Sequence, residues 1–145
     1  FPLVVVFGAD DLGAFETAMT VLLRWGRQWL ATFPQPPLPV LALVEAALRS
    51  HDRRLSRHLS RLGVGAAAYG WPLLRSVFTE VLSRKAWLRL FDHLCAGAAA
   101  DRAGLLPIAA AVAFAVAARR ALLTLESRED VGGFFRRQHA VDMGK

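Results

Sequence analysis

The chain has 145 residues, a formal net charge of +6 and one cysteine, Cys95. A chain of this length can bury roughly 70% of its unfolded surface, so a hydrophobic core needs no disulfide. One cysteine permits no internal disulfide, which excludes a secreted disulfide scaffold. No zinc-ligand spacing surrounds Cys95, and the glycines at 63, 65 and 70 lack the lysine and serine or threonine of a phosphate loop, so no metal or cofactor is predicted.

The first third of the chain is predicted to be a long helix followed by a stiff connector. Residues 1–7 are apolar but lack the basic region and cleavage site of a signal peptide, and three consecutive valines leave their secondary structure ambiguous. Asp10 or Asp11 is a plausible cap for a helix that reaches Phe33. In that helix Phe15, Trp25 and Trp29 lie near one side, and Gly26 weakens the helix without ending it. The prolines of residues 34–39 then break helical hydrogen bonding.

Two further helices are predicted at residues 38–50 and 52–62, closed by the glycines of residues 63–65. Four arginines recur at every fourth position across them, which predicts one basic ridge: Arg49, Arg53, Arg57 and Arg61. The same spacing fits a solvated helix face opposite Leu55, Leu59 and Leu62. It also fits a binding site for an acidic protein surface or, less well, for membrane headgroups. Nucleic acid is not predicted as a partner, because no aromatic residues interleave with these arginines as a stacking platform requires.

Residues 69–94 read as two amphipathic helices that break at Ser83 and face a common core. Helical periodicity places two apolar stripes on them, formed by Trp71, Leu74, Phe78 and Val81 and by Trp87, Leu90, Phe91 and Leu94. Aromatic residues at this spacing are typical of core anchors. Asp92, next to Phe91, is predicted to be a structural acceptor that caps a backbone group or pairs with an arginine.

The last third contains an alanine-rich segment at residues 103–118, sixteen residues without a charge. A bilayer-spanning helix needs about 20 such residues, so we predict a central buried helix and no transmembrane segment. Its predicted packing residues are Leu105, Ile108, Val112, Phe114 and Val116. A short final helix is expected at residues 127–138. The sequence therefore predicts an all-α fold of about seven or eight helices around one core, with residues 1–145 as a single domain.

The order of several residues adds a resemblance to a known family. Leu55 and the pair His58 and Leu59 are followed by Trp71, Phe78, Trp87 and the aromatic-aspartate pair Phe91 and Asp92. This order resembles the C-terminal half of a TBC domain, the helical module of Rab GTPase-activating proteins. The similarity extends over nearly all of the chain for a WD-repeat-bearing branch of that family. Its more specific pieces are residues 33–37, 78–82 and 87–92.

Two motifs on which the activity of this family depends are missing from this sequence, and their absence guides the expected function. TBC proteins that accelerate GTP hydrolysis carry an isoleucine-led motif with an arginine, and a tyrosine-x-glutamine. The arginine neutralises charge on the transferred phosphoryl group, and the glutamine positions the attacking water. Neither motif occurs here: the only tyrosine, Tyr69, is followed by Gly70 and Trp71. His58 and His93 also lack a paired serine or cysteine nucleophile, so no catalytic residue is predicted.

The resemblance thus implies a module that is not an enzyme. We expect a TBC-like interaction or scaffold module of a cytoplasmic protein at the centrosome, the centriolar satellites or the cilium. Its expected partners are a small Rab-type GTPase or centriolar and ciliary assembly components. The alternative is a GTPase activator for a Rab GTPase whose arginine and glutamine fingers lie upstream of residue 1.

Overall fold

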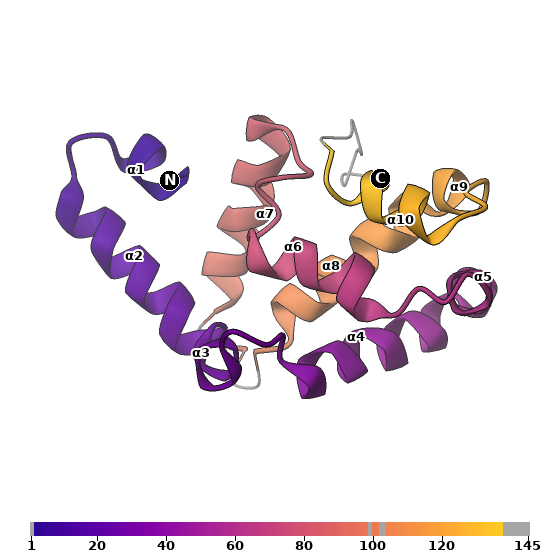
Figure 1. Cartoon of the computed structure of the whole chain (residues 1–145). Coiled ribbons are helices and arrows are strands. Elements are labelled where there is room, and N and C mark those ends of the chain that lie inside the picture. The colour runs from indigo at the N-terminus through magenta and orange to yellow at the C-terminus, as the bar shows by residue number, and fades with distance from the viewer. Residues whose placement is uncertain (1, 99, 102–103, 138–145) are drawn as a thin grey trace. The chain divides into compact units, whose positions relative to one another are not determined.

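The described part of the chain is entirely helical in its regular secondary structure. The computed structural model describes residues 2–98, 100–101 and 104–137, which form ten helices and no strand (Figure 1). The all-α prediction is confirmed, although the helices are shorter and more numerous than the seven or eight expected. The chain divides into two compact units, Phe1–Pro37 and Leu38–Lys145. The assignment of residues 1–145 to a single domain stays a prediction.

Unit 1 contains α1 (Pro2–Phe7), α2 (Asp11–Arg24) and α3 (Arg27–Thr32). Asp10 is the N-cap of α2, as predicted, because its carboxylate accepts a hydrogen bond of 2.9 Å from the Gly13 backbone N–H. The prediction of one helix as far as Phe33 is wrong. The backbone N–H groups of Trp25 and Gly26 both donate to the Val21 carbonyl, which ends α2 before α3 begins. The ring of Phe15, expected to pack, is 62% exposed.

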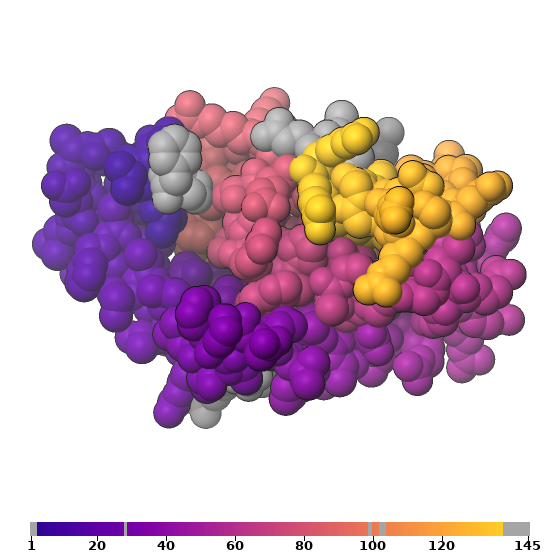
Figure 2. All heavy atoms as spheres, viewed as in Figure 1, coloured from indigo at the N-terminus to yellow at the C-terminus, as the bar shows by residue number. Residues whose placement is uncertain are grey.

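Unit 2 contains seven helices, of which α8 is the central one (Figure 1). They are α4 (Leu38–His51), α5 (Arg53–Arg61), α6 (Ala66–Arg75), α7 (Arg84–Gly97), α8 (Leu106–Ala117), α9 (Arg119–Leu122) and α10 (Arg128–Phe134). Helix α8 packs against α4, α6, α7 and α9, whereas α10 packs against α6. The space-filling view shows the atoms of α10, in yellow, lying over part of α6 (Figure 2).

Helix α8 is the buried alanine-rich helix that the sequence predicts. Its buried residues include Ile108, Val112 and Phe114 together with several alanines, whose small side chains allow neighbouring helices to approach closely. Leu105 is 49% exposed, so its predicted packing role is wrong: it precedes the first turn of the helix. Among the described residues, no helix has both the length and the apolar character that crossing a membrane demands. The predicted helix start at Ala103 lies outside the described residues.

Helix α5 ends in a Schellman motif, in which a residue with a left-handed backbone satisfies the last carbonyls. The Val64 N–H donates to the Leu59 carbonyl over 2.9 Å, and the Gly63 N–H donates to the Ser60 carbonyl over 3.1 Å. Gly63 has φ of +66°, and a Cβ built on it would meet nothing within 4 Å. A glycine therefore stands here for its backbone conformation and not for lack of space. The predicted closure of this helix by residues 63–65 is confirmed.

Helix α6 ends in the same motif, but without a glycine. The Phe78 N–H donates to the Leu73 carbonyl and the Val77 N–H to the Leu74 carbonyl, at 2.8 and 3.0 Å. Val77 and Phe78 have φ values of 48° and 63°, a conformation that L-residues with side chains adopt at a cost of about 1 to 2 kcal/mol each. The predicted helix as far as Ser83 is therefore wrong, because α6 ends at Arg75.

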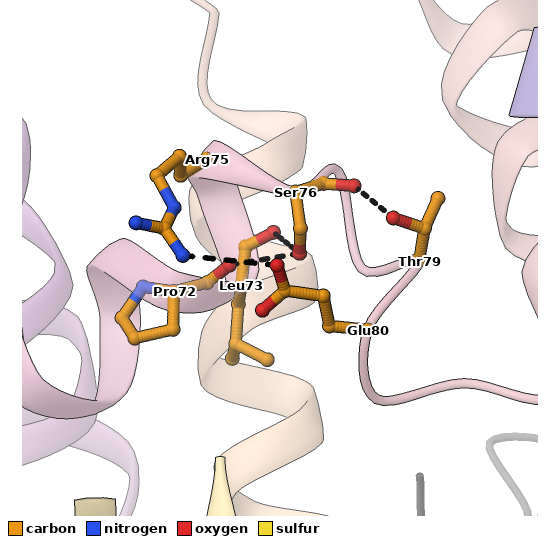
Figure 3. A network of polar contacts seen from close by, with 6 residues as sticks. All are labelled: Pro72, Leu73, Arg75, Ser76, Thr79 and Glu80. Atoms are coloured by element: carbon orange, nitrogen blue, oxygen red, sulfur yellow. Dashed lines mark hydrogen bonds and ion pairs between the residues drawn. The ribbon is translucent and has the colours of Figure 1, made fainter. Parts of the chain in front are cut away.

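Short polar contacts hold this helix end in place (Figure 3). The Ser76 hydroxyl donates to the Pro72 carbonyl at 2.8 Å, and the Thr79 hydroxyl donates to the Ser76 carbonyl at 2.7 Å. Arg75 and Glu80 form an exposed ion pair of 3.7 Å across the turn. Such side-chain hydrogen bonds to carbonyls compete with helix continuation, which explains why apolar periodicity alone overextends this helix.

The predicted aromatic anchors still reach the core of unit 2. Phe78 and Val81 are buried, although they lie in the turn after α6 and not on its stripe. Trp87 and Phe91 are buried on α7 and stack with ring centroids 4.8 Å apart. The Trp87 indole N–H donates to the Val77 carbonyl over 2.7 Å, which ties α7 to the turn. Trp71 is only half-buried.

The contrast between two glycines gives a test of the α5 terminus. Gly63→Ala should lower the free energy of unfolding by about 1 kcal/mol, because alanine is strained at positive φ. Gly132→Ala within α10 is the matched control, and it should raise that free energy by about 0.5 to 1 kcal/mol through helix propensity. Urea denaturation followed by circular dichroism measures both. Equal effects of the two substitutions would contradict the assignment of Gly63 as the left-handed cap.

Candidate protein-binding surface around helix α5

Helix α5 is fixed at its first turn by Asp52, whose side chain is buried at 7% exposure. The Asp52 carboxylate accepts a hydrogen bond of 2.9 Å from the Leu55 N–H, which makes Asp52 the N-cap of α5. Its other oxygen lies 2.9 Å from Nε of Arg119, the first residue of α9. That N–H is not aligned for a hydrogen bond, but opposite charges at this separation still attract. One carboxylate thus joins the start of α5 to α9.

A second contact joins the middle of α5 to the segment after α9. Nε2 of the partly buried His58 lies 3.0 Å from the Leu125 carbonyl oxygen, so this ring nitrogen is the one that carries the donor proton. Leu55 and Leu59, on the inner side of α5, are 0% and 1% exposed. The predicted motif residues Leu55, His58 and Leu59 therefore hold α5 against the rest of unit 2. The opposite side of the helix is left in solvent.

Four arginines occupy that solvent side and define the α5 arginine face: Arg53, Arg54, Arg57 and Arg61. All four are exposed, and none of them forms an ion pair with another described residue. Helix α5 contains no acidic residue, and Arg54, Arg57 and Arg61 line a shallow hollow of about 540 Å³ together with Ser60. The result is a local concentration of positive charge on a rigidly held helix, at one side of unit 2 (Figure 1).

Arg49 lies on α4, so the arginines of the predicted ridge are divided between two helices, and the ridge as a binding surface stays a prediction. Asp52 has an extended backbone, with φ of −139° and ψ of 85°, which separates α4 from α5. Arg49 lies on α4 and lines a second hollow of about 250 Å³, which we call the tyrosine pocket. The polar lining of this pocket is Glu45, Arg49, Ser56, Ser60 and Tyr69, and its apolar lining is Leu48, Leu59 and Val64.

Contacts from α4 and from the end of α10 position α6 at the tyrosine pocket. One carboxylate oxygen of Glu45 accepts a hydrogen bond of 2.8 Å from the Ala66 N–H, which joins α4 to the start of α6. The Tyr69 ring lies against Phe135, with ring centroids 6.1 Å apart. Burial, and next the Glu45 carboxylate, raise the pKa of the Tyr69 hydroxyl above its ordinary value, so this group stays protonated at neutral pH and can donate a hydrogen bond.

Asp92 lies apart from this surface. It is exposed on α7, and within the described residues its carboxylate takes part in no hydrogen bond or ion pair. Asp52, which the sequence predicts only as the first residue of a helix, instead caps a backbone N–H and pairs with an arginine, as was expected of Asp92. An aspartate followed three residues later by a buried leucine was the available signal. Glu45 and Tyr69 carried no signal, because their proximity depends on how α4 and α6 pack.

The groups on this surface are mainly hydrogen-bond donors and positive charges. The described residues contain no cluster of three histidine, cysteine, aspartate or glutamate side chains that could bind a metal ion. Unpaired guanidinium groups and a protonated hydroxyl bind carboxylates and other anions. The fold of unit 2 and this surface define an all-α helical module.

Comparison with known proteins places this module beside TBC proteins. The chain is 36% identical over 144 residues to TBC1 domain family member 31 of Xenopus tropicalis, 37% identical over 144 residues to that of Oryzias latipes and 33% identical over 143 residues to that of Homo sapiens. Each alignment covers 99% of the chain and 13% of the relative. No family model matches the chain, and no solved structure matches it. The predicted resemblance to a TBC domain is confirmed, and these relatives support a TBC-type module.

Substitution of Asp52 tests how α5 is held. Asp52→Ala should lower the free energy of unfolding by about 1 to 2 kcal/mol, most of it from the lost cap. The ion pair adds less, because the Arg119 side chain is 43% exposed and solvent screens it. Asp52→Asn keeps a capping oxygen and should retain most of the stability in urea denaturation. An asparagine variant as unstable as the alanine variant would instead make the ion pair the dominant contact.

Proposed function

We propose that this chain is a non-catalytic, TBC-type module that binds an acidic surface of a protein partner through the α5 arginine face. The single observation that carries the proposal is the set of exposed arginines of α5, which have no acidic neighbour on their own helix. Unpaired charges on a mobile segment would be an ordinary solvated surface. Here Asp52 and His58 fix the helix that carries them, so the charges are pre-arranged for a partner.

The absence of the activating motifs from the printed sequence supports a role without catalysis. Stimulated GTP hydrolysis in this family depends on an arginine and a glutamine in two motifs, and the chain contains neither motif. Resemblance to the WD-repeat-bearing branch supports assembly at the centrosome, the centriolar satellites or the cilium. A small Rab-type GTPase or a centriolar or ciliary assembly component is then the proposed partner.

Charge reversal tests the binding surface. The double variant Arg53→Glu, Arg57→Glu should weaken association with native partners at least about tenfold, because it replaces attraction by repulsion at the contact. Proximity labelling in ciliated cells, with and without the substitutions, measures which centriolar, ciliary or Rab-positive vesicle proteins depend on the arginines. The matched control is Arg89→Glu on α7, an exposed arginine away from α5. Unchanged labelling by the double variant would return the α5 arginine face to a solvated helix surface.

A hydrolysis measurement separates this role from that of an activator. The chain should leave the single-turnover rate of GTP hydrolysis unchanged for every member of a panel of Rab-type GTPases, since it lacks both activating side chains. A TBC protein that carries both motifs serves as the positive control. A rate that rises with the concentration of the chain would contradict the proposal and favour an activator that uses other residues.

A further inference from the structure

The tyrosine pocket is lined by the hydroxyl-bearing side chain of Tyr69. The Tyr69 side chain is 3% exposed, and its ring position is set by Phe135 on one side. Within the described ranges its hydroxyl forms no hydrogen bond, although it lines the pocket together with Glu45 and Arg49. The donor is therefore available to an acceptor that enters the pocket.

Arg49 supplies a second and charged donor at the same place. Its guanidinium is exposed and forms no ion pair with any described residue. Glu45 lies one helical turn before it, but one oxygen of that carboxylate is already occupied by the Ala66 N–H. The other oxygen can accept a backbone N–H. The pocket thus offers donors for a carboxylate and one acceptor for the peptide group beside it.

The tyrosine pocket adjoins the α5 arginine face at Ser60. Ser60 lines both the pocket and the shallow hollow that contains Arg57 and Arg61. A bound peptide with one side chain in the pocket at Arg49 can therefore pass Ser60 and continue along α5. Positive charge on both sides of Ser60 requires negative charge on that chain.

We propose that the tyrosine pocket is the anchor subsite for an acidic peptide segment of a protein partner. One aspartate or glutamate carboxylate of the segment accepts hydrogen bonds from Arg49 and the Tyr69 hydroxyl, and the following acidic residues pair with Arg57 and Arg61. This inference rests on the proposed function and adds to it the chemical class of the ligand. It also adds a specificity element, because a neutral donor on a ring held against Phe135, beside a cation, discriminates a correctly placed carboxylate from diffuse negative charge.

Other anionic partners fit the pocket less well. A volume of about 250 Å³ admits one side chain, whereas a membrane surface is broad and would meet the exposed arginines without entering the pocket. A nucleic acid strand would need exposed aromatic rings on which bases stack, and α5 has no aromatic residue apart from the partly buried imidazole of His58.

Fluorescence anisotropy with the full chain tests the proposal. The probe is a labelled peptide of alternating glutamate and serine, compared with the same peptide carrying glutamine. The glutamate peptide should bind more tightly, and high salt should weaken it. Tyr69→Phe keeps the ring against Phe135 and removes only the hydroxyl, and it should weaken binding about fivefold. Arg49→Gln should weaken it about tenfold or more.

Two controls keep the result interpretable. Arg89→Gln on α7 should bind the peptide like the unchanged chain. Tyr69→Phe should keep the denaturation midpoint, and if it does not, Arg49→Gln carries the test because Arg49 is exposed.

The outcomes distinguish this inference from the proposed function. Loss of binding in the Arg53→Glu, Arg57→Glu variant, with Tyr69→Phe and Arg49→Gln unaffected, would overturn the anchor subsite and leave the proposed function in place. Indifference of all these variants would overturn both. Tyr69→Phe should not change whatever affinity the protein has for vesicles of phosphatidylserine or for a single-stranded RNA. An equal dependence of either on the Tyr69 hydroxyl would show that the pocket does not select a peptide.

Discussion

The surface of this module depends on the corner between α4 and α5, where Asp52 makes three contacts. Its N–H donates to the Leu48 carbonyl at the end of α4, its carboxylate caps α5, and the same carboxylate pairs with Arg119. A straight continuation of α4 would have placed every fourth arginine on one stripe. The corner instead divides the exposed arginines, so that Arg49 lies at the tyrosine pocket and the others lie on α5. Burial of Leu55 and Leu59 then keeps α5 in that direction.

Two helix ends with one geometry show where periodicity fails as a predictor. Gly63 and Val77 occupy equivalent positions in the Schellman motifs that end α5 and α6. Glycine adopts positive φ readily, so the sequence signals the first end. Valine does not, and the turn is maintained by contacts from elsewhere, including the Trp87 indole at 2.7 Å from the Val77 carbonyl and the burial of Phe78. Strain of this kind persists only where the surrounding packing compensates for it.

The comparisons with known proteins support the class of the module, whereas the proposed ligand depends on the surface of α5. Identity of 33–37% to TBC1 domain family member 31 in several vertebrates supports a TBC-type module, but the chain spans only 13% of those relatives. The recognition chemistry is therefore argued from the residues themselves. Arginines without ion-pair partners on a fixed helix, with the pocket lined by Tyr69 beside them, carry the proposed recognition of an acidic protein ligand.

The sequence by itself determined the all-α class, the buried alanine-rich helix and the ends of α5, because apolar spacing, aspartate caps and glycine act over a few residues. Aromatic residues were also correctly placed in the core, since burial of Phe78 and Trp87 follows from their apolar area wherever the helix ends. Only the tertiary structure decided the division of the arginines, the role of Glu45, the ion pair of Asp52 with Arg119, and the tyrosine pocket. Each of these depends on contacts between segments far apart in the chain, such as Asp52 with Arg119 and Tyr69 with Phe135, which no local pattern encodes.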